Sequence, residues 1–480
     1  MLFNSIEFLI FLPIVFILYW FVFRQLRIQN LLIVIASYMF YGWWNKEFLI
    51  LIASTSLLSY ISGIVIEGFE GKRCWQKFFS ATNIIINLAI LGYFKYCNFF
   101  GESFANLLNS FGIKADWVTL DIILPVGISF YTFQALSYSI DVYRGKIKAT
   151  KDIVAFFAYI SFFPQLVAGP IERATNLLPQ ILKRRTFDYG LAVDGCRQIL
   201  WGFFKKMVIA DNCAVAVDSI WNNYQNESGF TLLIGGVLFA FQIYGDFSGY
   251  SDIAIGSAKL FGITLKQNFN FPYFSRNTAE FWRRWHISLT TWFKDYLYIP
   301  LGGSRCSKKR VILNTITIFV LSGIWHGANW TFLVWGIYNA ILFIPLLLTK
   351  SNRKYIDMVA NGRYLPSFKE SINMIITFIL ATFGWIIFRS NSITEAFEYI
   401  SIIFSKSLLN IEMPYGKGVM IGILFMILLE WFNRDKEYGL QFKGTGILKY
   451  SVVKWVIYYS IIIATILFMC VNQTFIYFQF

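Results

Sequence analysis

Histidine is scarce in this chain of 480 residues, which contains only His286 and His326. Charged residues are also few: they make up 14% of the sequence, against about 25% in an ordinary soluble domain. With 57% hydrophobic residues, this composition excludes water as the main solvent of the fold. No polar stretch is long enough to form a soluble domain, so we expect one membrane domain over residues 1–480.

Several motifs that would carry other functions are missing. The six cysteines are scattered without a C-x-x-C pair, which argues against a disulfide framework or a zinc site. There is no nucleophile elbow, P-loop or H-E-x-x-H motif. Asp246 and Asp252 lack a third cluster of oxygen ligands, so we expect no metal and no bound cofactor. The net charge of +15 collects at the ends of apolar segments, as in membrane proteins, so we expect no nucleic-acid partner.

Apolar windows long enough to cross a hydrocarbon core of roughly 30 Å recur along the sequence. Because lipid cannot satisfy open strand edges, they predict an all-α polytopic membrane protein. Basic connections alternate between these windows, which predicts that both chain ends face away from the cytoplasm. The windows, of which 195–219 is the weakest, are 6–23, 29–45, 48–66, 79–99, 121–141, 195–219, 230–249, 311–327, 329–349, 370–388, 417–433 and 451–473.

Two further apolar stretches are not expected to span the membrane. The stretch 152–169 has basic residues at both ends, Lys151 and Lys183, and Pro164 within it. We expect a re-entrant segment or irregular hairpin there, next to an internal cavity that encloses its non-helical backbone. The stretch 394–404 is short and amphipathic, which predicts a helix in the outer interface.

Both histidines lie in segments with few other polar groups. His326 ends an apolar window within Leu321–Trp330, and His286 lies among tryptophans and arginines within Phe281–Thr290. Ionisable residues at membrane depth are costly and are functional candidates for that reason. An imidazole, with an ordinary pKa of about 6.5, suits proton transfer at neutral pH. A hydrogen-bonded packing role is an equally strong interpretation of His326 from the pattern alone, and a stronger one of His286.

Three other polar features are candidates for substrate binding. Asp246 and Ser248 follow the end of a span in a glycine-containing stretch, where they line a substrate path or only form a polar helix end. A basic cluster is expected to contact phosphates of a nucleotide-bearing donor, and it consists of Arg283, Arg284, Lys294, Arg305 and 308–310. Ordinary positive-inside charge explains 308–310 equally well, but it explains Arg283 and Arg284, which tryptophans flank, less well. Tyr477 lies in the aromatic tail 475–480, whose composition favours an interfacial belt.

These motifs together resemble the membrane-bound O-acyltransferase family, in its bacterial alginate O-acetylase-like branch. The similarity runs nearly end to end, with motifs at 37–44, 124–131, 163–173, 246–252, 283–286 and 325–327. The resemblance implies about 11–12 tilted transmembrane helices, with re-entrant and interfacial helices, around a central pore. Such a protein is expected to be a multi-pass enzyme of the bacterial cytoplasmic membrane.

The resemblance also implies roles for particular residues. His326, in its Trp-His-Gly setting, matches the catalytic histidine and is expected to be the general base, with His286 as its helper. We expect Trp325 and Asn329, in the same segment, to take part in binding the substrates. The tail resembles a C-terminal hexapeptide whose tyrosine carries the acyl group in a subset of the family, so Tyr477 becomes a candidate acyl carrier.

Such enzymes move an acyl group from a cytoplasmic thioester to a hydroxyl. We expect acetyl-CoA as the donor substrate, a polysaccharide as the acceptor, and an extracytoplasmic partner acetyltransferase of the SGNH-hydrolase-like class. D-alanyl transfer to teichoic acid and acetyl transfer to peptidoglycan stay open within the same fold. A transporter also stays open: the broken stretch at 152–170 is compatible with one, although no internal repeat is visible.

Overall fold

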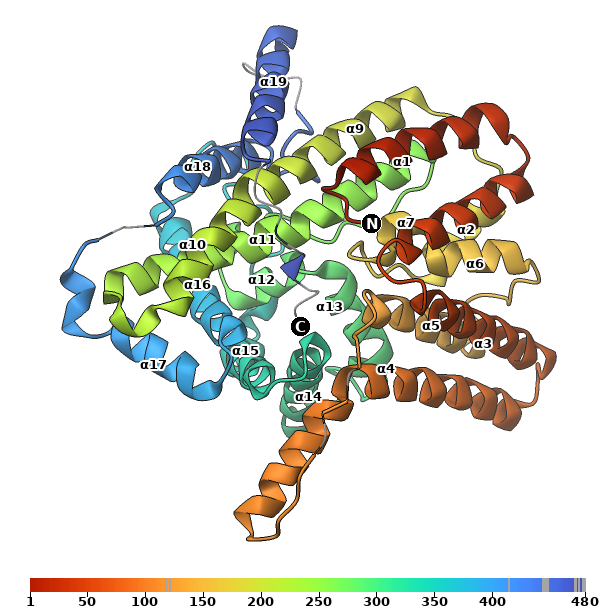
Figure 1. Cartoon of the computed structure of the whole chain (residues 1–480), viewed down its shortest axis with the longest axis horizontal. Helices are drawn as coiled ribbons and strands as arrows, with labels where there is room; N and C mark the ends of the chain where they lie inside the picture. Colours follow the sequence, from red (N-terminus) through yellow and green to blue (C-terminus); the bar gives the residue numbers. More distant parts are fainter. Residues whose placement is uncertain are drawn as a thin grey trace. The chain divides into compact units, whose positions relative to one another are not determined.

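The computed structural model describes residues 1–117, 119–120, 122–412, 415–442, 449–469, 473 and 475–476. All regular secondary structure in these ranges is helical and none of it is strand, which confirms the predicted all-α class (Figure 1). The chain forms two compact units. The first contains Met1–Val193 and Ser257–Lys266, and the second contains Asp194–Gly256 and Gln267–Phe480. One membrane domain over the whole chain stays a prediction.

Within the described ranges, five helices are both long and apolar enough to cross a membrane, so the protein is a polytopic membrane protein. They are α3 (Phe48–Gly68), α4 (Arg73–Ser110), α11 (Gly229–Leu260), α15 (Trp330–Leu348) and α16 (Phe368–Arg389). Shorter apolar helical stretches occupy Ile6–Val22 and Ser451–Leu467. Other predicted windows coincide with shorter helices, such as the 16-residue α18 (Lys417–Phe432).

The first unit packs short and long helices against one another. Helix α3 lies against α4 and α5 (Ile128–Tyr143), and α2 (Leu26–Gly42) lies against α6 (Ile153–Ser161). The remaining helices of this unit are α1 (Ile6–Ile17), α7 (Phe163–Leu166), α8 (Ala174–Leu182) and the start of α9 (Tyr189–Phe203).

The stretch 152–169 is broken between α6 and α7, and a re-entrant segment or hairpin there stays a prediction. Phe162 leaves the helical region, with ψ of 105°, and interrupts the chain of backbone hydrogen bonds. That interruption takes the carbonyl oxygen of Tyr159 out of the regular helical pattern of backbone bonds. It accepts hydrogen bonds from the side-chain amides of Gln134 at 2.6 Å and Gln165 at 3.0 Å. Both amides are buried, so the protein itself supplies the hydrogen bonds that this non-helical backbone needs. Lipid has no groups that could supply them. The cavity expected beside it stays a prediction.

The second unit is built on α11, of which 72% of the most apolar window is buried. A continuous helical stretch from α9 through the π-helical turn Phe204–Ala210 into α10 (Asp211–Asn222) runs beside it. Besides α15, α16 and α18, this unit contains α12 (Thr278–Arg284), α13 (Ile287–Phe293), α14 (Lys308–His326), α17 (Ile393–Ile403) and α19 (Ser451–Leu467). Helix α17 covers the amphipathic stretch 394–404, and its place in the membrane interface stays a prediction.

Glycines allow α9 and α11 to approach closely. A Cβ atom on Gly202 would lie 2.6 Å from the carbonyl oxygen of Gly249, and one on Gly256 would lie 2.5 Å from the carbonyl oxygen of Gly195. Small residues let membrane helices approach at backbone distance. This contact holds the lysines that follow α9 against the polar stretch of α11.

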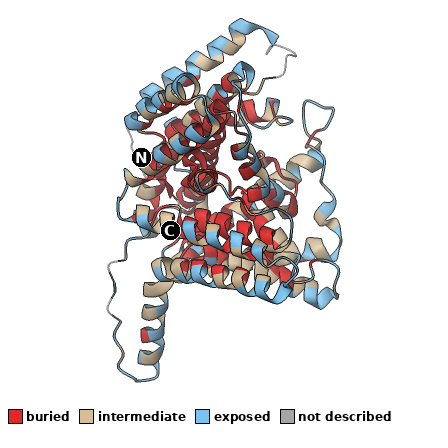
Figure 2. Cartoon of the chain, turned by 90° about the vertical axis from the view of Figure 1, so that its right-hand side faces the viewer, coloured by how far each residue is buried: buried red, intermediate tan, exposed pale blue. Residues whose placement is uncertain are grey.

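Burial is uneven among the helices, as Figure 2 shows by colour. In α19 only Ile461 is buried among 17 residues, whereas in α5 almost every residue is. Large apolar side chains are exposed along α4 and α19, for example Ile85 and Val452. Such exposure suits helices that face lipid.

Candidate active site

His326 lies at the last position of α14, where that helix turns back into α15. Gly327 follows in an extended conformation, and the side chain of Asn329 then caps α15 by accepting the backbone N–H of Thr331 at 3.0 Å. The two helices are in close contact, since a Cβ on Gly336 would lie 2.5 Å from the carbonyl oxygen of Phe319. This hairpin fixes the position of the His326 imidazole.

The His326 ring is buried among other rings. Its centroid lies 5.0 Å from that of Trp325, 5.1 Å from Trp335 and 5.3 Å from Phe388. Trp325 also lies 5.8 Å from the ring of His286. The indole of Trp325 therefore touches both histidines, which the sequence had placed 40 positions apart. Asn329, in contrast, serves the backbone: its amide donates to the carbonyl of Asn391 at 2.9 Å.

His286 occupies an uncommon backbone conformation, with φ of 43° at the start of α13. A non-glycine residue with positive φ is strained and persists where the surroundings enforce it. Here Ile287 donates its N–H to the carbonyl of Asn268 at 2.9 Å, which ties the start of α13 to the loop after α11. The ring itself lies 4.6 Å from that of Phe247.

The hydrogen bonds around Asn268 determine the tautomer of His286. The backbone N–H of Ser288 points at Oδ1 of Asn268, at 3.3 Å, and an N–H can only donate, so this atom is the amide oxygen. Nδ1 of His286 lies 3.1 Å from the same oxygen and must therefore carry a proton. Burial lowers the pKa of His286 to about 3. The ring is thus neutral at physiological pH, and its Nε2 carries the lone pair.

A cavity of about 620 Å³ brings the two histidines together. Both line it, as do polar side chains of α13 and α14, including Thr290, Thr315 and Ser322. Three exposed basic side chains, Lys294, Arg305 and Arg353, belong to the same lining. The cavity therefore joins a basic, accessible rim to two buried imidazoles.

The loop that supplies Arg305 depends on glycine. Gly302 and Gly303 have φ of 105° and 56°, a region that favours glycine, and both line the cavity. The amide of Asn314 on α14 donates to the carbonyl of Leu301 at 3.1 Å. This bond holds the loop against the helix that ends in His326.

Arg283 and Arg284 are engaged in hydrogen bonds with the protein. Arg283 donates to the carbonyls of Asn352 at 2.6 Å and Tyr355 at 2.5 Å, and Arg284 pairs with Glu280 at 2.9 Å. Neither is among the residues that line the cavity. By holding the loop at Asn352, Arg283 supports the neighbouring cavity residue Arg353. A role of the two arginines in donor binding stays a prediction.

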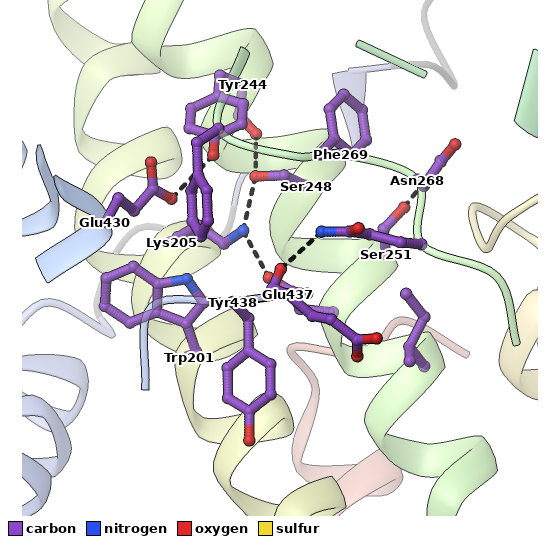
Figure 3. A pocket seen from close by; sticks show the side chains of 14 residues that line it. Trp201, Lys205, Tyr244, Ser248, Ser251, Asn268, Phe269, Glu430, Glu437 and Tyr438 are labelled. Carbon is purple, nitrogen blue, oxygen red and sulfur yellow. Dashed lines mark hydrogen bonds and ion pairs between the residues drawn. The ribbon is translucent and has the colours of Figure 1, made fainter. Parts of the chain in front are cut away.

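Asp246 and Ser248 belong to buried ion-pair clusters next to this cavity. Asp246 pairs with Lys206 at 2.8 Å. Ser248 accepts from Lys205 at 2.8 Å, as Figure 3 shows. Ser251, in the same stretch of α11, accepts from the amide of Asn268 at 3.0 Å. Asn268 thus connects the polar face of α11 to His286.

Tyr477 lies outside the described residues, but the segment before it is described. Phe475 and Ile476 are both buried. The ring of Phe475 lies 4.3 Å from that of Tyr250 and 5.9 Å from that of Phe247. Burial of these two residues against α11 argues against the interfacial belt for this part of the tail.

The sequence interpretation did not single out Asn268 or Arg353, whereas Lys294 and Arg305 belong to the basic cluster that it proposed for the donor, and both line the cavity. Nothing in the local pattern distinguishes Asn268, because its role arises from the loop that brings it to His286. Lys205 and Lys206 did have a signal, namely charge within an apolar window, and the carboxylates of the Asp246–Asp252 stretch were available to pair with them.

A helical membrane protein with two buried imidazoles at one cavity of ligand size has the construction of a membrane enzyme. The model of the membrane-bound O-acyltransferase family (MBOAT) matches residues 146–388. The chain therefore belongs to this family and is an O-acyltransferase, which confirms the resemblance and the enzyme class and leaves the transporter alternative without support.

Relatives with assigned names agree with this placement. The chain is 38% identical over 445 residues to the probable alginate O-acetylase AlgI of Pseudomonas aeruginosa, covering 92% of this chain and 82% of the relative. It is 33% identical to the peptidoglycan O-acetyltransferase of Helicobacter pylori, covering 83% and 79%. A teichoic acid D-alanyltransferase of Bacillus subtilis is 28% identical over 55% of this chain and 68% of its own length.

Proposed function

We propose that this enzyme moves an acetyl group from cytoplasmic acetyl-CoA across the bacterial cytoplasmic membrane, for O-acetylation of a cell-surface or exported polysaccharide. The observation that carries the proposal is the cavity whose lining extends from exposed Lys294, Arg305 and Arg353 to buried His286 and His326. The similarity to an alginate O-acetylase supports acetyl as the acyl group and a polysaccharide as the acceptor.

The basic rim suits the phosphates of the donor. Three cationic side chains around one opening attract a polyanion, and arginine binds phosphate oxygens through paired N–H groups. The volume of about 620 Å³ lies within the roughly 300–1,000 Å³ typical of ligand pockets. We assign phosphate binding to Lys294, Arg305 and Arg353, with Arg283 holding the loop of Arg353 from outside.

The chemistry is a transfer from a thioester to a hydroxyl. His326 takes the proton of the accepting hydroxyl while its oxygen bonds to the acetyl carbonyl carbon. The carbon–sulfur bond then breaks, and the thiolate of CoA leaves and recovers a proton from the imidazolium. His286, neutral and held by Asn268, offers Nε2 as a hydrogen-bond acceptor that orients the reacting groups. The reaction uses acetyl-CoA as a substrate and calls for no bound cofactor.

The first accepting hydroxyl in this proposal is that of Tyr477. A phenol has an ordinary pKa of about 10, so a neighbouring base is needed to deprotonate it at neutral pH. The acetyl ester then passes to an extracytoplasmic SGNH-hydrolase-like partner, which transfers it to the polysaccharide. Burial of Phe475 and Ile476 beside Phe247, which contacts His286, supports a tail that enters the site.

Proteoliposomes test the reaction directly. The purified enzyme is inserted in vesicles with labelled acetyl-CoA on one side and candidate glycans with an extracytoplasmic partner on the other. The expected result is label on the glycan that depends on His326. Two outcomes would contradict the proposal. The first is label on the glycan when the enzyme lacks the His326 side chain. The second is no transfer of label from acetyl-CoA, together with transfer of D-alanine from a D-alanyl carrier protein. The second outcome would assign the enzyme to D-alanyl transfer instead.

A further inference from the structure

Two adjacent lysines, buried beside α11, hold different carboxylates. Lys205 and Lys206 are 3% and 1% exposed on the π-helical turn after α9. Lys205 pairs with Asp252 at 2.5 Å, and Lys206 pairs with both Asp246 and Asp211 at 2.8 Å. Buried charges at membrane depth are expensive, and they are retained where they do something that an apolar pair could not.

The two ion pairs face different stripes of α11. Ser248 and Asp252 are four residues apart and share one face, which Lys205 contacts through both. Asp246 and Tyr250 share another face, and Nζ of Lys206 lies 2.8 Å from Asp246 and 5.4 Å from the Tyr250 ring centroid. The π-helical turn thus places two neighbouring lysines against two different faces of α11.

Only the Lys206 pair touches the C-terminal segment within the described residues. Lys206 donates to the carbonyl oxygen of Gln473 at 3.2 Å, and Asp246 accepts the backbone N–H of Ile476 at 2.7 Å. Phe475, between them in sequence, packs on Tyr250. Buried backbone outside an α-helix needs partners for its N–H and C=O groups, and here Lys206 and Asp246 supply one each.

The C-terminal residues that Lys206 and Asp246 bind lie next to the histidine site. Phe475 contacts Phe247, whose ring lies 4.6 Å from that of His286. Consecutive Cα atoms are about 3.8 Å apart, so the chain that follows Ile476 starts two residues from this contact. Holding Ile476 therefore restricts where the following residues can reach.

We propose that the Lys206–Asp246 ion pair is a clamp that holds Gln473 and Ile476 inside the protein and thereby restricts where the residues that follow Ile476 can reach. Lys206 and Asp246 are positioning residues in this role. Delivery of the Tyr477 hydroxyl to His326 rests on the proposed function, whereas the clamp itself does not. In this proposal Asp246, within the stretch 246–252, binds the C-terminal segment and does not line a substrate path.

Carboxypeptidase digestion of the full-length protein in nanodiscs, followed by intact mass measurement, reports the clamp without using activity. In the unchanged protein, digestion should stop at or before Ile476. In Lys206→Met and in Asp246→Ala, residues 473–476 should be removed roughly tenfold faster or more, because proteolysis follows the population of the released tail. Lys205→Met is the matched control, since it breaks the Asp252 pair and should leave the tail protected.

Exchanging the two charges distinguishes binding of the tail from a contribution of the ion pair to the stability of the fold. Lys206→Glu combined with Asp246→Lys keeps opposite charges but presents an acceptor to the Gln473 carbonyl and a donor to the Ile476 N–H. This variant should elute as folded protein, release its tail and lose kcat with an unchanged KM for acetyl-CoA. Asp246→Asn, which keeps an acceptor oxygen, should retain more protection than Asp246→Ala.

The outcomes distinguish the clamp from the proposed function. Tail protection that is the same in Lys206→Met, Asp246→Ala and the unchanged protein overturns the clamp, and so does equal release in Lys205→Met. If the tail is released as expected but the unchanged protein transfers no acetyl group, the clamp stands and the acetyl-transfer proposal falls.

Discussion

Oδ1 of Asn268 lies 3.1 Å from Nδ1 of His286, and this hydrogen bond decides which nitrogen of the imidazole keeps the lone pair. The same oxygen accepts the hydroxyl of Ser288 at 2.8 Å, and the Asn268 amide donates to Ser251 on α11. A loop asparagine therefore sets the orientation and tautomer of a buried histidine. In metal and protease sites, too, the group behind a histidine fixes its tautomer.

Replacing Asn268 by a carboxylate should make activity sensitive to pH. Burial holds the pKa of His286 at about 3, so the ring stays neutral throughout the physiological range. In Asn268→Asp a negative charge beside the Nδ1 proton raises that pKa, and the ring takes up a second proton at Nε2 as pH falls. A neighbouring opposite charge shifts a pKa by roughly 1–3 units, so we expect kcat/KM of this variant to fall below about pH 6, measured as a pH–rate profile. Ser288→Ala, which leaves the histidine bond in place, should keep the original profile.

Removing the proposed base should slow the acetyl-transfer step strongly and change acetyl-CoA binding little. His326→Ala should lower kcat by about 10²–10⁴-fold with a nearly unchanged KM for acetyl-CoA, because a general base contributes on that scale. Single-turnover transfer of labelled acetyl, measured beside the Tm of each variant, tests this. Full activity in His326→Ala would remove His326 from the mechanism.

The basic rim should govern donor affinity. Arg305→Gln and Arg353→Gln should each raise the KM for acetyl-CoA by roughly tenfold, with kcat little changed, because a hydrogen bond to a charged group contributes about 1.5–3 kcal/mol. Both side chains are exposed, so the effect should shrink as salt is added. Arg310→Gln, an exposed arginine in the first turn of α14 that is absent from the cavity lining, is the control and should leave KM unchanged.

If Tyr477 carries the acetyl group, Tyr477→Phe should stop transfer to the glycan and leave acetyl-CoA binding intact. An acid-quenched reaction of the unchanged protein without partner should show an acetyl adduct on the C-terminal peptide by mass spectrometry. His326→Ala should lack that adduct, since the phenol then has no base. Full transfer by Tyr477→Phe would show that another hydroxyl accepts the acetyl group.

Much of the fold could be predicted from the sequence because apolar windows are local. Helix α15 at Trp330–Leu348 coincides with the window 329–349, and the break after α6 falls in the stretch where Pro164 and basic residues at both ends predicted one. Helix lengths were less predictable. Helix α4 spans Arg73–Ser110 and so extends past both ends of the window 79–99, because hydropathy marks only the apolar part of a helix whose ends are polar.

The candidate site could be predicted only in part, because side-chain partners are set by the tertiary fold. The two histidines were visible from their rarity, and the structure places both on one cavity. The guanidinium of Arg283 instead meets two backbone carbonyls of the loop at 352–355, which no local pattern reveals. The lysines at 205 and 206 required knowledge of which carboxylates of α11 face them.

The close contact between α14 and α15 gives a last prediction, on stability. A Cβ on Gly336 would lie 2.5 Å from the carbonyl oxygen of Phe319, which is backbone and cannot rotate away, so Gly336→Ala must push the two helices apart. We expect a loss of about 1–3 kcal/mol of stability, seen as a lower Tm in detergent. Activity should fall as well, because α14 carries His326 at its end. Gly92→Ala in α4, where no atom lies within 4 Å of the new Cβ, is the matched control and should keep or raise the Tm, since alanine favours helix by about 1 kcal/mol. Equal Tm values for the two variants would mean that the helices can separate at this contact without cost.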